Sequence, residues 1–209
     1  MAKVIDLRKI YVWELLEDTE AGLKYGKPKR LAKAIKAELK PKTVEAKLYA
    51  DGALDEAYSA VTSYDLSFEI NELSLEDQAW LLGSKVNDKG MIEMSSETEA
   101  PYFAIAFETP MTSGKVQYVN ILKAQFMPLD ESYETRGENV NFQTPKITAV
   151  GAVSNFTSTF GYKVIGDEAN KDVVNAWYSI PQLMEGQATV DQSKEPKPKK
   201  KAPKTTVGA

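Results

Sequence analysis

Apolar and polar residues alternate along the segment from residue 31 to residue 48, which is the pattern of a half-buried β-strand. The apolar side contains Leu31, Ile35, Ala37, Leu39, Val44, Ala46 and Leu48. The opposite side is charged and contains Lys36, Glu38, Lys40, Glu45 and Lys47. Because proline cannot donate to a central strand ladder, we expect Lys40-Pro41-Lys42 to be a turn between two strands. The segment therefore predicts a hairpin with one buried face and one charged, solvated face.

Further strands are expected on both sides of this hairpin. Residues 10–16 are rich in strand formers, and a polar loop with Gly22 and Gly26-Lys27-Pro28 follows them. Residues 50–59 break the alternation and predict a long, mostly polar loop. The clearest strand comes next, with Ala60, Thr62, Tyr64, Leu66, Phe68 and Ile70 on one face. Later strand candidates are residues 90–94, 102–108, 115–127, 140–150 and 159–165, with a hairpin turn at residues 112–114.

Two short helices complete the expected body. Ser74 and the acids after it resemble a capping box ahead of residues 78–82, and Gly83 fits the position just after a helix. Residues 169–177 predict a closing helix, whose apolar stripe contains Val173, Val174 and Trp177. We therefore expect one mostly-β domain with one or two short helices, either a sandwich or an open barrel.

The last part of the chain has a different composition. Residues 184–209 are rich in lysine and proline and cannot bury a core, so we expect disorder there and a folded domain over residues 1–183. From Ser193 onward, six lysines and one acid give a charge of +5. The whole chain carries −4, so the remaining residues carry −9. An acidic body is thus joined to a basic end.

Composition excludes several classes of chemistry. The 209 residues include no cysteine and no histidine. Disulfides, thiolate nucleophiles, a Ser-His-Asp triad and the commonest metal ligands are therefore excluded. No apolar run approaches the ~20 residues that span a bilayer, and charges near the N-terminus interrupt any signal peptide. We expect a protein that folds in a cytoplasm and does not insert into a membrane.

The remaining candidates for chemistry each have a simpler structural explanation. Acidic pairs occur at Glu17-Asp18, Asp55-Glu56, Glu76-Asp77 and Asp130-Glu131. No spacing resembles a Ca²⁺ loop, and solvated loops or helix N-termini explain them. Trp13, Trp80 and Trp177 are expected in the core rather than stacked on a sugar or a base. The lysine-rich end has no arginine and no interleaved aromatic residue, which favours a solubilising segment. No catalytic, metal or cofactor site is predicted.

Five short strings along the chain form a pattern that is specific only when they are taken together. They are Met-Ala-Lys-Val-Ile-Asp-Leu-Arg-Lys-Ile-Tyr-Val at the start, Leu-Tyr-Ala-Asp-Gly at 48–52, Ala-Pro-Tyr at 100–102, Tyr-Glu-Thr-Arg-Gly-Glu at 133–138 and Asn-Phe-Gln-Thr-Pro-Lys at 141–146. In this order and at these spacings they resemble the major tail proteins, or tail tube proteins, of long-tailed siphophages that infect Gram-positive bacteria. The resemblance covers about residues 1–183 and leaves out the lysine-rich end.

The resemblance implies a structural protein rather than an enzyme. It implies a tail-tube β-sandwich that assembles as hexameric rings, in which each subunit gives strands to a continuous β-barrel around a lumen. Stacked rings form the non-contractile tube of the virion, which is assembled in the host cytoplasm and conducts double-stranded DNA to the host cell. The implied partners are other copies of the chain, a tape-measure protein, tail-tip or baseplate proteins and a tail-terminator protein.

The resemblance also directs attention to two groups of contact residues. A long loop suits a contact between stacked rings, and the candidates there are Tyr49, Asp51, Leu54 and Tyr58. Arg136, among residues 133–137, is a candidate for an ion pair with an adjacent subunit or within the chain.

The lumen-facing candidates are Lys36, Glu38, Lys40, Glu45 and Lys47. An acidic body suits a DNA conduit, because a basic wall would bind the phosphates. The mixed charges of these five residues depart from that expectation. Either the lumen charge comes from elsewhere, or these residues face neighbouring subunits.

Three other functions stay open at this point. A nucleic-acid-binding accessory protein would use the basic end, and its salt-sensitive DNA affinity would be lost on deletion of residues 193–209. A carbohydrate-active or other hydrolytic β-sandwich would need a carboxylate pair in a cleft, which no pattern in the sequence places. The tube of a phage-derived injection particle shares its fold and role with a phage tail tube, so the sequence does not separate these two.

Overall fold

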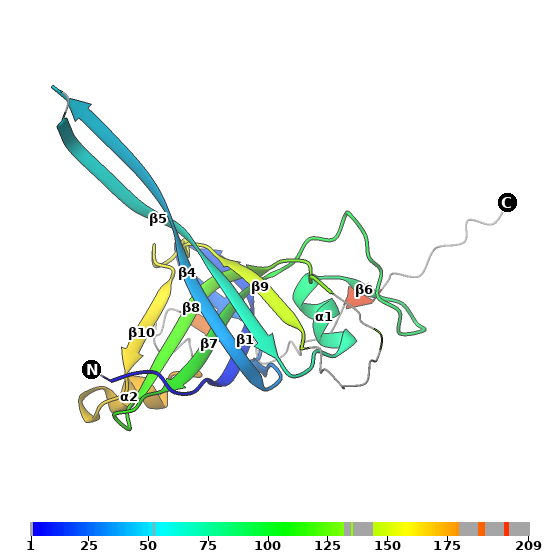
Figure 1. The fold of residues 1–209 in the computed structure, drawn as a ribbon. Coiled ribbons are helices and arrows are strands. Elements are labelled where there is room, and N and C mark those ends of the chain that lie inside the picture. Colours follow the sequence, from blue (N-terminus) through cyan, green and yellow to red (C-terminus); the bar gives the residue numbers. More distant parts are fainter. Residues whose placement is uncertain are drawn as a thin grey trace.

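The chain folds around one large, mostly antiparallel β-sheet accompanied by two short α-helices (Figure 1). The computed structural model describes residues 2–51, 53–131, 135, 144–179, 188–190 and 199–200. The main sheet contains β1 (Arg8–Thr19), β2 (Gly22–Tyr25), β3 (Lys29–Arg30), β4 (Ala34–Ala50), β5 (Ala53–Ile70), β7 (Tyr102–Pro110), β8 (Val116–Phe126), β9 (Lys146–Gly151), β10 (Gly161–Ile165) and β11 (Ala188–Val190). The strand order is β11-β2-β1-β7-β8-β9-β5-β4, while β3 pairs with β1 and β10 pairs with β8. The expectation of a mostly-β body with two short helices is confirmed.

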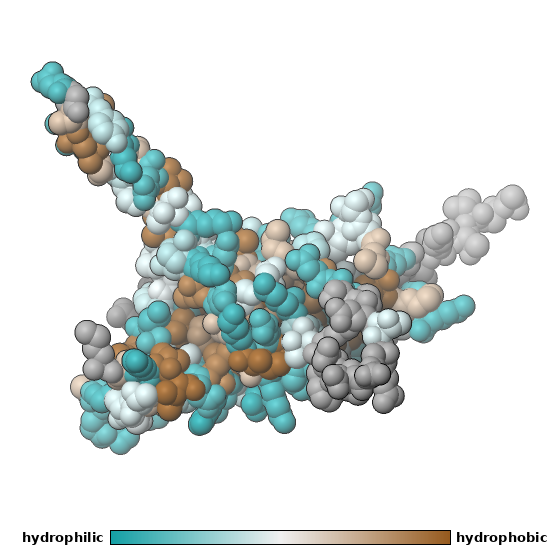
Figure 2. All heavy atoms as spheres, in the orientation of Figure 1, coloured by the Kyte–Doolittle hydropathy of each residue, from teal (hydrophilic) through white to brown (hydrophobic). Residues whose placement is uncertain are grey.

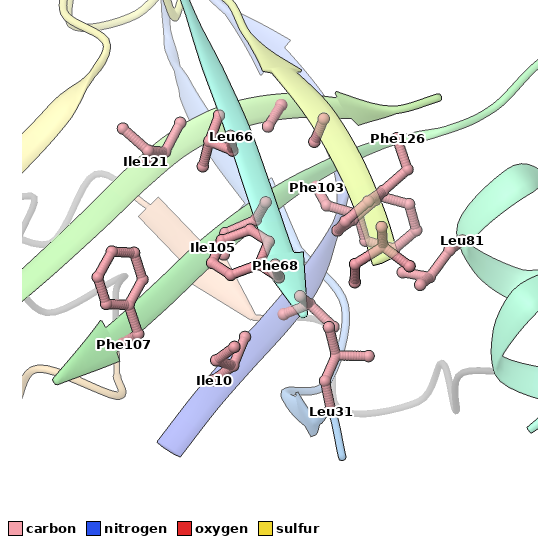
Figure 3. Close-up of a cluster of buried hydrophobic side chains, with 14 of the residues drawn as sticks. Ile10, Leu31, Leu66, Phe68, Leu81, Phe103, Ile105, Phe107, Ile121 and Phe126 are labelled. Atoms are coloured by element: carbon pink, nitrogen blue, oxygen red, sulfur yellow. The ribbon is translucent and has the colours of Figure 1, made fainter. Parts of the chain in front are cut away.

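The main core lies between two groups of strands from this sheet. In Figure 1, β4, β5 and β9 pass in front of β1, β7 and β8. Figure 3 shows side chains of both groups meeting, with Leu66 and Phe68 of β5 near Ile105 of β7 and Ile10 of β1. All four are at most 1 % exposed, and burying such a side chain contributes about 1.5–3 kcal/mol. The open antiparallel sheet is consistent with a β-sandwich.

A second, smaller core covers the opposite face of β1. Val12 belongs to the main core and the adjacent Trp13 to the second, as expected when successive side chains of a strand point to opposite faces. The 3₁₀ turn η1 (Glu168–Asn170) and helix α2 (Lys171–Asn175) precede Trp177, which closes this core. Trp13, Trp80 and Trp177 are all buried, so the prediction that they pack in the core is confirmed.

Helix α1 (Leu75–Leu82) begins and ends where the sequence predicts. The Ser74 hydroxyl accepts a hydrogen bond from the Asp77 N–H at 3.1 Å, which caps the first turn. Gly83 ends the helix in the left-handed region with φ of 68°. A Cβ at this position would also overlap the Glu99 carbonyl oxygen, so both the backbone angle and the space require glycine.

Two predictions about the long hairpin are wrong. The expected turn at Lys40-Pro41-Lys42 is absent, because β4 continues through Pro41, which pairs with Tyr64. The strand β4 lies at the edge of the sheet, where a residue without an N–H is tolerated. Residues 50–59 are not a loop either, since β5 begins at Ala53 and stays in register with β4. The hairpin turn lies instead at Asp51, whose φ is 49°.

Other expected elements differ in extent. Part of the polar loop after residue 19 is strand β2, which forms a hairpin with β1. Residues 90–94 form only an isolated bridge between Ile92 and Val86. There the Asn87 side chain accepts hydrogen bonds from the Lys89 and Met91 N–H groups, both at 3.0 Å, and so competes with a strand ladder.

The strands expected over residues 102–108, 115–127 and 159–165 correspond to β7, β8 and β10. The strand expected over residues 140–150 corresponds to β9 from Lys146, and its first residues lie outside the described ranges.

The basic end is described only at two short strands. Strand β11 pairs in parallel with β2, and β12 (Lys199–Lys200) pairs in parallel with β6 (Lys85–Val86). The rest of residues 184–209 lies outside the described residues, so disorder there stays a prediction. None of the helices within the described ranges is both long and apolar enough to cross a membrane.

Candidate assembly interface

The distal half of the β4–β5 hairpin leaves the body as an arm, which we define as residues 42–63 (Figure 1). At the base, β5 pairs with β9 on its other side, but this pairing ends at Tyr64 opposite Gly151. Beyond it, among the strands that the structure describes, the arm strands pair only with each other, from Lys42 opposite Ser63 to Ala50 opposite Ala53. An isolated two-stranded hairpin is only marginally stable in water. Within the described part of the chain, no third strand packs beside the arm, so its own stability is expected to be low.

One face of the arm is apolar and exposed. Cross-strand partners share a face, so Val44 and Ala46 on β4 lie beside Ala60 and Tyr58 on β5, followed by Leu48, whose partner Glu56 ends the apolar surface. We call these five residues the apolar stripe. Val44 and Leu48 are each 56 % exposed and Tyr58 is 63 % exposed. Figure 2 shows hydrophobic side chains along the projecting arm. A contiguous exposed apolar surface of this kind typically marks an interaction site.

The apolar stripe is not an extension of the core. At the base of β4, Ala37 and Leu39 pack against the main core, and both have odd numbers. On the arm, the apolar residues of β4 are even-numbered, so they project from the opposite face of the same strand. The change of phase occurs at Pro41, the position that the sequence alone indicates as a turn. The stripe therefore has no partner in the core of its own chain.

The tip of the arm combines apolar and acidic residues. Tyr49 and Leu54 lie opposite each other and are 65 % and 52 % exposed. Asp51, Asp55 and Glu56 form no ion pair among the described residues. The four predicted contact residues Tyr49, Asp51, Leu54 and Tyr58 are thus brought together on one exposed arm. Arg136 lies outside the described residues, so its role stays a prediction.

The five lumen candidates lie along β4 but do not share a face. Lys36 and Lys40 both bind Glu38 at 2.7 Å on one face of the base. Hydrogen bonds from Lys36 and then Lys40 lower the pKa of Glu38 to about 2. Glu45 and Lys47 lie on the other face, on the arm, 3.6 Å apart. Which of these surfaces lines a lumen stays a prediction.

A groove opens where the main sheet divides beside β8. The same edge of β8 pairs with β10 over residues 117–121 and with β9 over residues 124–126. Strands β5 and β4 continue the sheet beyond β9, whereas no described strand lies beyond β10. The resulting space, of about 410 Å³, lies between β10 and the base of the arm. Its lining includes Leu39, Tyr64, Asn120, Phe160, Tyr162 and Lys163.

Asn120 is a buried polar residue of β8, and its cross-strand partner Ala106 belongs to the second core, so its side chain lies on that face of the strand. Its side chain is 1 % exposed, and its Oδ1 accepts a hydrogen bond from the Tyr162 N–H at 2.8 Å. Its Nδ2 has no hydrogen-bond partner among the residues that the structure describes. An unsatisfied buried donor of this kind costs about 1–3 kcal/mol.

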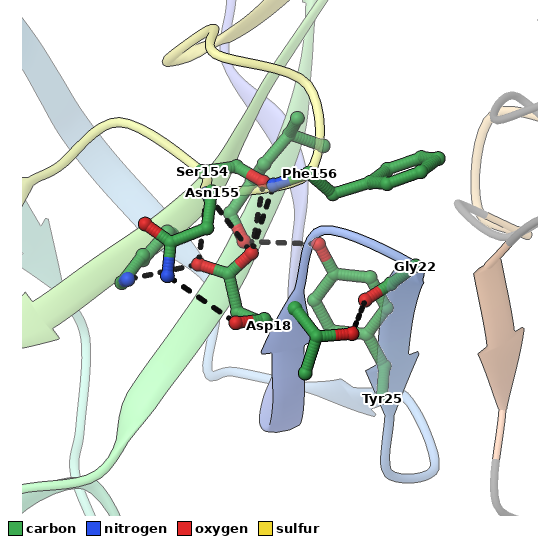
Figure 4. Close-up of polar contacts among 9 residues, drawn as sticks. Asp18, Gly22, Tyr25, Ser154, Asn155 and Phe156 are labelled. Carbon is green, nitrogen blue, oxygen red and sulfur yellow. Dashed lines mark hydrogen bonds and ion pairs between the residues drawn. The ribbon is translucent and has the colours of Figure 1, made fainter.

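Asp18 is the centre of a group of polar contacts with Ser154, Asn155 and Phe156, as Figure 4 shows. The Asp18 carboxylate accepts from Lys123 Nζ at 2.8 Å, Ser154 Oγ at 3.2 Å and the Asn155 and Phe156 N–H groups at 3.0 and 3.3 Å. Burial opposes ionisation, but the hydrogen bonds from Lys123 and Asn155 outweigh it and hold the pKa of Asp18 below its usual range. We call Asp18 and its four partners the Asp18 clamp.

The clamp fixes the segment that leads into β10. Ser158, on the groove, donates its N–H to the Ser154 carbonyl at 2.9 Å and has a left-handed φ of 52°. The prediction that Glu17-Asp18 is a solvated loop pair is therefore wrong for Asp18, whose side chain is 7 % exposed. No pattern in the residues around Asp18 predicts its burial, because its hydrogen-bond partners are at least 105 residues away in the sequence.

No protein-family model matches the chain, and no curated protein matches it. Among the residues that the structure describes, no group of three or more acidic side chains is placed to hold a metal ion. The arm, the groove and the Asp18 clamp are therefore the features from which function is inferred.

Proposed function

We propose that this chain is a major tail protein, the structural subunit of a non-contractile phage tail tube. Copies polymerise as stacked hexameric rings around a tape-measure protein, between tail-tip proteins and a tail terminator. The finished tube belongs to the virion and conducts double-stranded DNA to the host cell. The observation that carries this proposal is the arm, whose apolar stripe is exposed and faces away from the core of its own chain.

Two further observations support assembly with copies of the same chain. Strand β4 is the last strand of the sheet, and the outer edge of β10 has no partner among the described strands. Exposed strand edges favour uncontrolled pairing, and a barrel that continues from subunit to subunit would cover them. The body also carries a net charge of −9, which keeps the wall of a conduit from binding DNA phosphates.

The test is assembly of the purified full chain, followed by negative-stain electron microscopy and by sedimentation of the polymer. We expect hollow, regularly striated tubes, or six-fold rings seen end-on. Leu48→Lys places a charge on the apolar stripe and is expected to reduce the sedimented fraction roughly tenfold, the equivalent of about 1.4 kcal/mol. The matched control is Ser59→Lys, which lies on the other face of the arm opposite Glu45 and is expected to assemble normally.

Two results would overturn this proposal. One is wild-type protein that forms neither rings nor tubes at any concentration tested. The other is a Leu48→Lys variant that assembles as well as Ser59→Lys, because the apolar stripe would then not be the contact. Circular dichroism of both variants checks that neither substitution unfolds the body.

A further inference from the structure

We propose that the basic end of this chain, residues 193–209, docks on an acidic surface around helix α1 of the same chain. This inference goes beyond the proposed function and does not depend on it. It rests on a strand pairing between the two regions, on their opposite charges and on the short tether that joins them.

Strand β6 has two edges, of which one is covered by its own loop and one receives the basic end. On the first edge, Ile92 forms an antiparallel bridge with Val86. On the other edge, Lys199 and Lys200 of β12 pair in parallel with Lys85 and Val86. A segment that is added to a strand edge in this way is held by main-chain hydrogen bonds, which do not require a particular side chain.

The sequence of the basic end explains where this pairing begins. Pro196 and Pro198 have no N–H group, so the residues around them cannot supply a continuous ladder. Residues 199–202 follow as a run without proline, which ends at Pro203. The first two residues of this run are the ones that pair with β6. The pairing therefore begins where the alternating prolines end.

The surface around β6 is acidic. We define the acidic α1 surface as residues 72–99, in which seven acids and two lysines give a charge of −5, opposite to the +5 of the basic end. Helix α1 contacts β6, and the Glu99 carbonyl oxygen lies close to Gly83, two residues before β6. Five acids of this surface are exposed and form no ion pair among the described residues, namely Glu72, Glu76, Asp88, Glu97 and Glu99.

The attraction comes from these surrounding acids and not from the residues that pair directly. Lys199 lies opposite Lys85, and like charges opposite each other on neighbouring strands are destabilising. The favourable charge interactions of the basic end are therefore with the exposed acids around β6. Exposed ion pairs contribute little singly and are screened by salt. Docking should accordingly weaken as the ionic strength rises.

A short tether compensates for this weakness. Strand β11 pairs with β2 on the body, and only residues 191–198 separate it from β12. This part of the chain spans at most about 30 Å even when it is fully extended. A segment that is tethered so closely has an effective concentration on the order of millimolar at its docking surface. Weak contacts are therefore sufficient for docking within one chain.

Docking keeps the lysines of the basic end away from nucleic acid. The end contains six lysines, which could otherwise neutralise DNA phosphates. In the docked state, phosphates have to compete with the carboxylates of the acidic α1 surface for these lysines. The chain therefore behaves toward DNA as an acidic protein until the basic end is released.

Disulfide trapping in the full chain tests the docking directly, because the chain has no cysteine of its own. Lys85→Cys with Lys199→Cys places two thiols at directly paired positions. The matched control, Lys163→Cys with Lys199→Cys, makes the same change in charge. Lys163 is exposed and belongs to β10, on the opposite side of the body from β6 (Figure 1). Dilute protein is oxidised mildly at low salt, and non-reducing gels with thiol counting by mass spectrometry follow the initial rate of crosslinking.

We expect the Lys85 pair to form crosslinked monomer roughly tenfold faster than the Lys163 pair, because docking raises the effective concentration of the two thiols. This excess should disappear at about 1 M salt, where exposed charges are screened. Equal rates at low salt, or disulfide-linked dimers in place of crosslinked monomers, would overturn docking within one chain. An excess that persists at high salt would overturn the role of the acidic α1 surface.

A second measurement tests whether docking withholds the lysines from DNA. Glu97→Gln with Glu99→Gln removes two charges from the acidic α1 surface, and the control, Asp55→Asn with Glu56→Gln, removes two exposed charges from the arm. Fluorescence anisotropy with labelled double-stranded DNA at low salt compares their affinities. We expect the first variant to bind roughly threefold more tightly than the control, because released lysines contact phosphates. Deletion of residues 193–209 should abolish this difference. Equal affinities of the two variants would overturn the inference that docking withholds the lysines.

Discussion

The two halves of the β4–β5 hairpin carry similar apolar residues but differ in what these residues contact. At the base, Leu66 and Phe68 are buried in the main core. On the arm, Leu48 and Tyr58 are exposed. One ladder joins the halves, with a register shift between Lys42 and Thr43 that leaves one extra residue on β5. On β4 the difference arises from the phase of the apolar residues, which changes at Pro41. On β5 it arises from this bulge, which turns Ala60 and Tyr58 away from the core face. The same alternation serves folding in one half and, in our proposal, assembly in the other.

The largest effect on the isolated chain is expected when a ring is removed from the base. Phe68 is 1 % exposed and contacts Phe107 edge to face at 5.9 Å. Phe68→Ala is expected to lower the free energy of unfolding by about 3–5 kcal/mol, because it leaves a cavity in a packed core. Tyr58→Ala, the counterpart on the arm, is expected to change it by less than about 0.5 kcal/mol. Urea denaturation of both variants measures the contrast, and equal losses would show that the arm is packed in the monomer.

A smaller loss is expected at the Asp18 clamp, where a charge is buried in the body. Asp18→Asn is expected to lower the free energy of unfolding by about 2–3 kcal/mol at pH 7, because Lys123 is left largely buried without its ion-pair partner. The matched control is Glu17→Gln, since Glu17 is 61 % exposed and binds Lys24 only at 3.6 Å. The control is expected to stay within about 0.5 kcal/mol of wild type. A control as damaging as Asp18→Asn would mean that the clamp is not the source of the loss.

The free energy of unfolding that Asp18→Asn loses should depend on pH in a defined direction. The pKa of Asp18 in the folded chain lies below the value of about 3.9 for an unfolded aspartate. The stabilisation by Asp18 is therefore complete above the unfolded value and is lost as pH falls through the folded value. The difference between wild type and Asp18→Asn should be constant from about pH 5 to 7 and shrink below about pH 4, again by linkage. A difference that grows on acidification would contradict the assignment.

Elements whose determinants are local could be predicted from the sequence. The Ser74 cap, the Gly83 terminus and the alternation over residues 64–70 each depend on neighbouring residues, and all three are confirmed. The prediction that Ala60 shares the face of Leu66 is wrong, because a β-bulge at residue 62 turns Ala60 to the other face. The turn at Pro41 could not be judged locally, because proline is tolerated only if its strand lies at an edge, which the whole sheet order decides. Residues 50–59 carry no clear alternation, and their strand depends on the partner that β4 provides.

The groove and the Asp18 clamp could not be predicted from the sequence, for a different reason. Asp18 and its partners in the segment from Ser154 to Phe156 are separated by at least 136 residues. The groove exists only because β9 and β10 share one edge of β8, so Asn120 has no local feature that marks it. The β4 half of the apolar stripe, in contrast, was visible as a pattern, and its burial was predicted wrongly. The β5 half was not, because Tyr58 was expected in a loop and Ala60 on the core face. A stripe whose phase disagrees with the neighbouring core face is the signal that indicates a partner outside the chain.

The smallest effect on stability is expected at Glu38, on the charged face of the base. Glu38→Gln is expected to leave the unfolding transition unchanged, because exposed ion pairs contribute little. The titration of Glu38 itself should differ clearly from that of a free glutamate. Hydrogen bonds from Lys36 and Lys40 lower its pKa to about 2, whereas an unperturbed glutamate titrates near 4.3. Carboxyl-carbon NMR measures this midpoint, which should move toward the usual value at about 1 M salt, where exposed charges are screened.

If Glu38 titrates at low salt with the midpoint of an unperturbed glutamate, Lys36 and Lys40 do not form lasting ion pairs with it. The charged face of the base would then be no better ordered than the arm, where Glu45 and Lys47 are 3.6 Å apart. In that case the two halves of the hairpin would differ only in the burial of their apolar residues. A midpoint that is low, and that rises with salt, would instead show a second difference. The base would present an ordered, charge-paired face to its surroundings, and the arm would leave its tip carboxylates available for a cation on another copy.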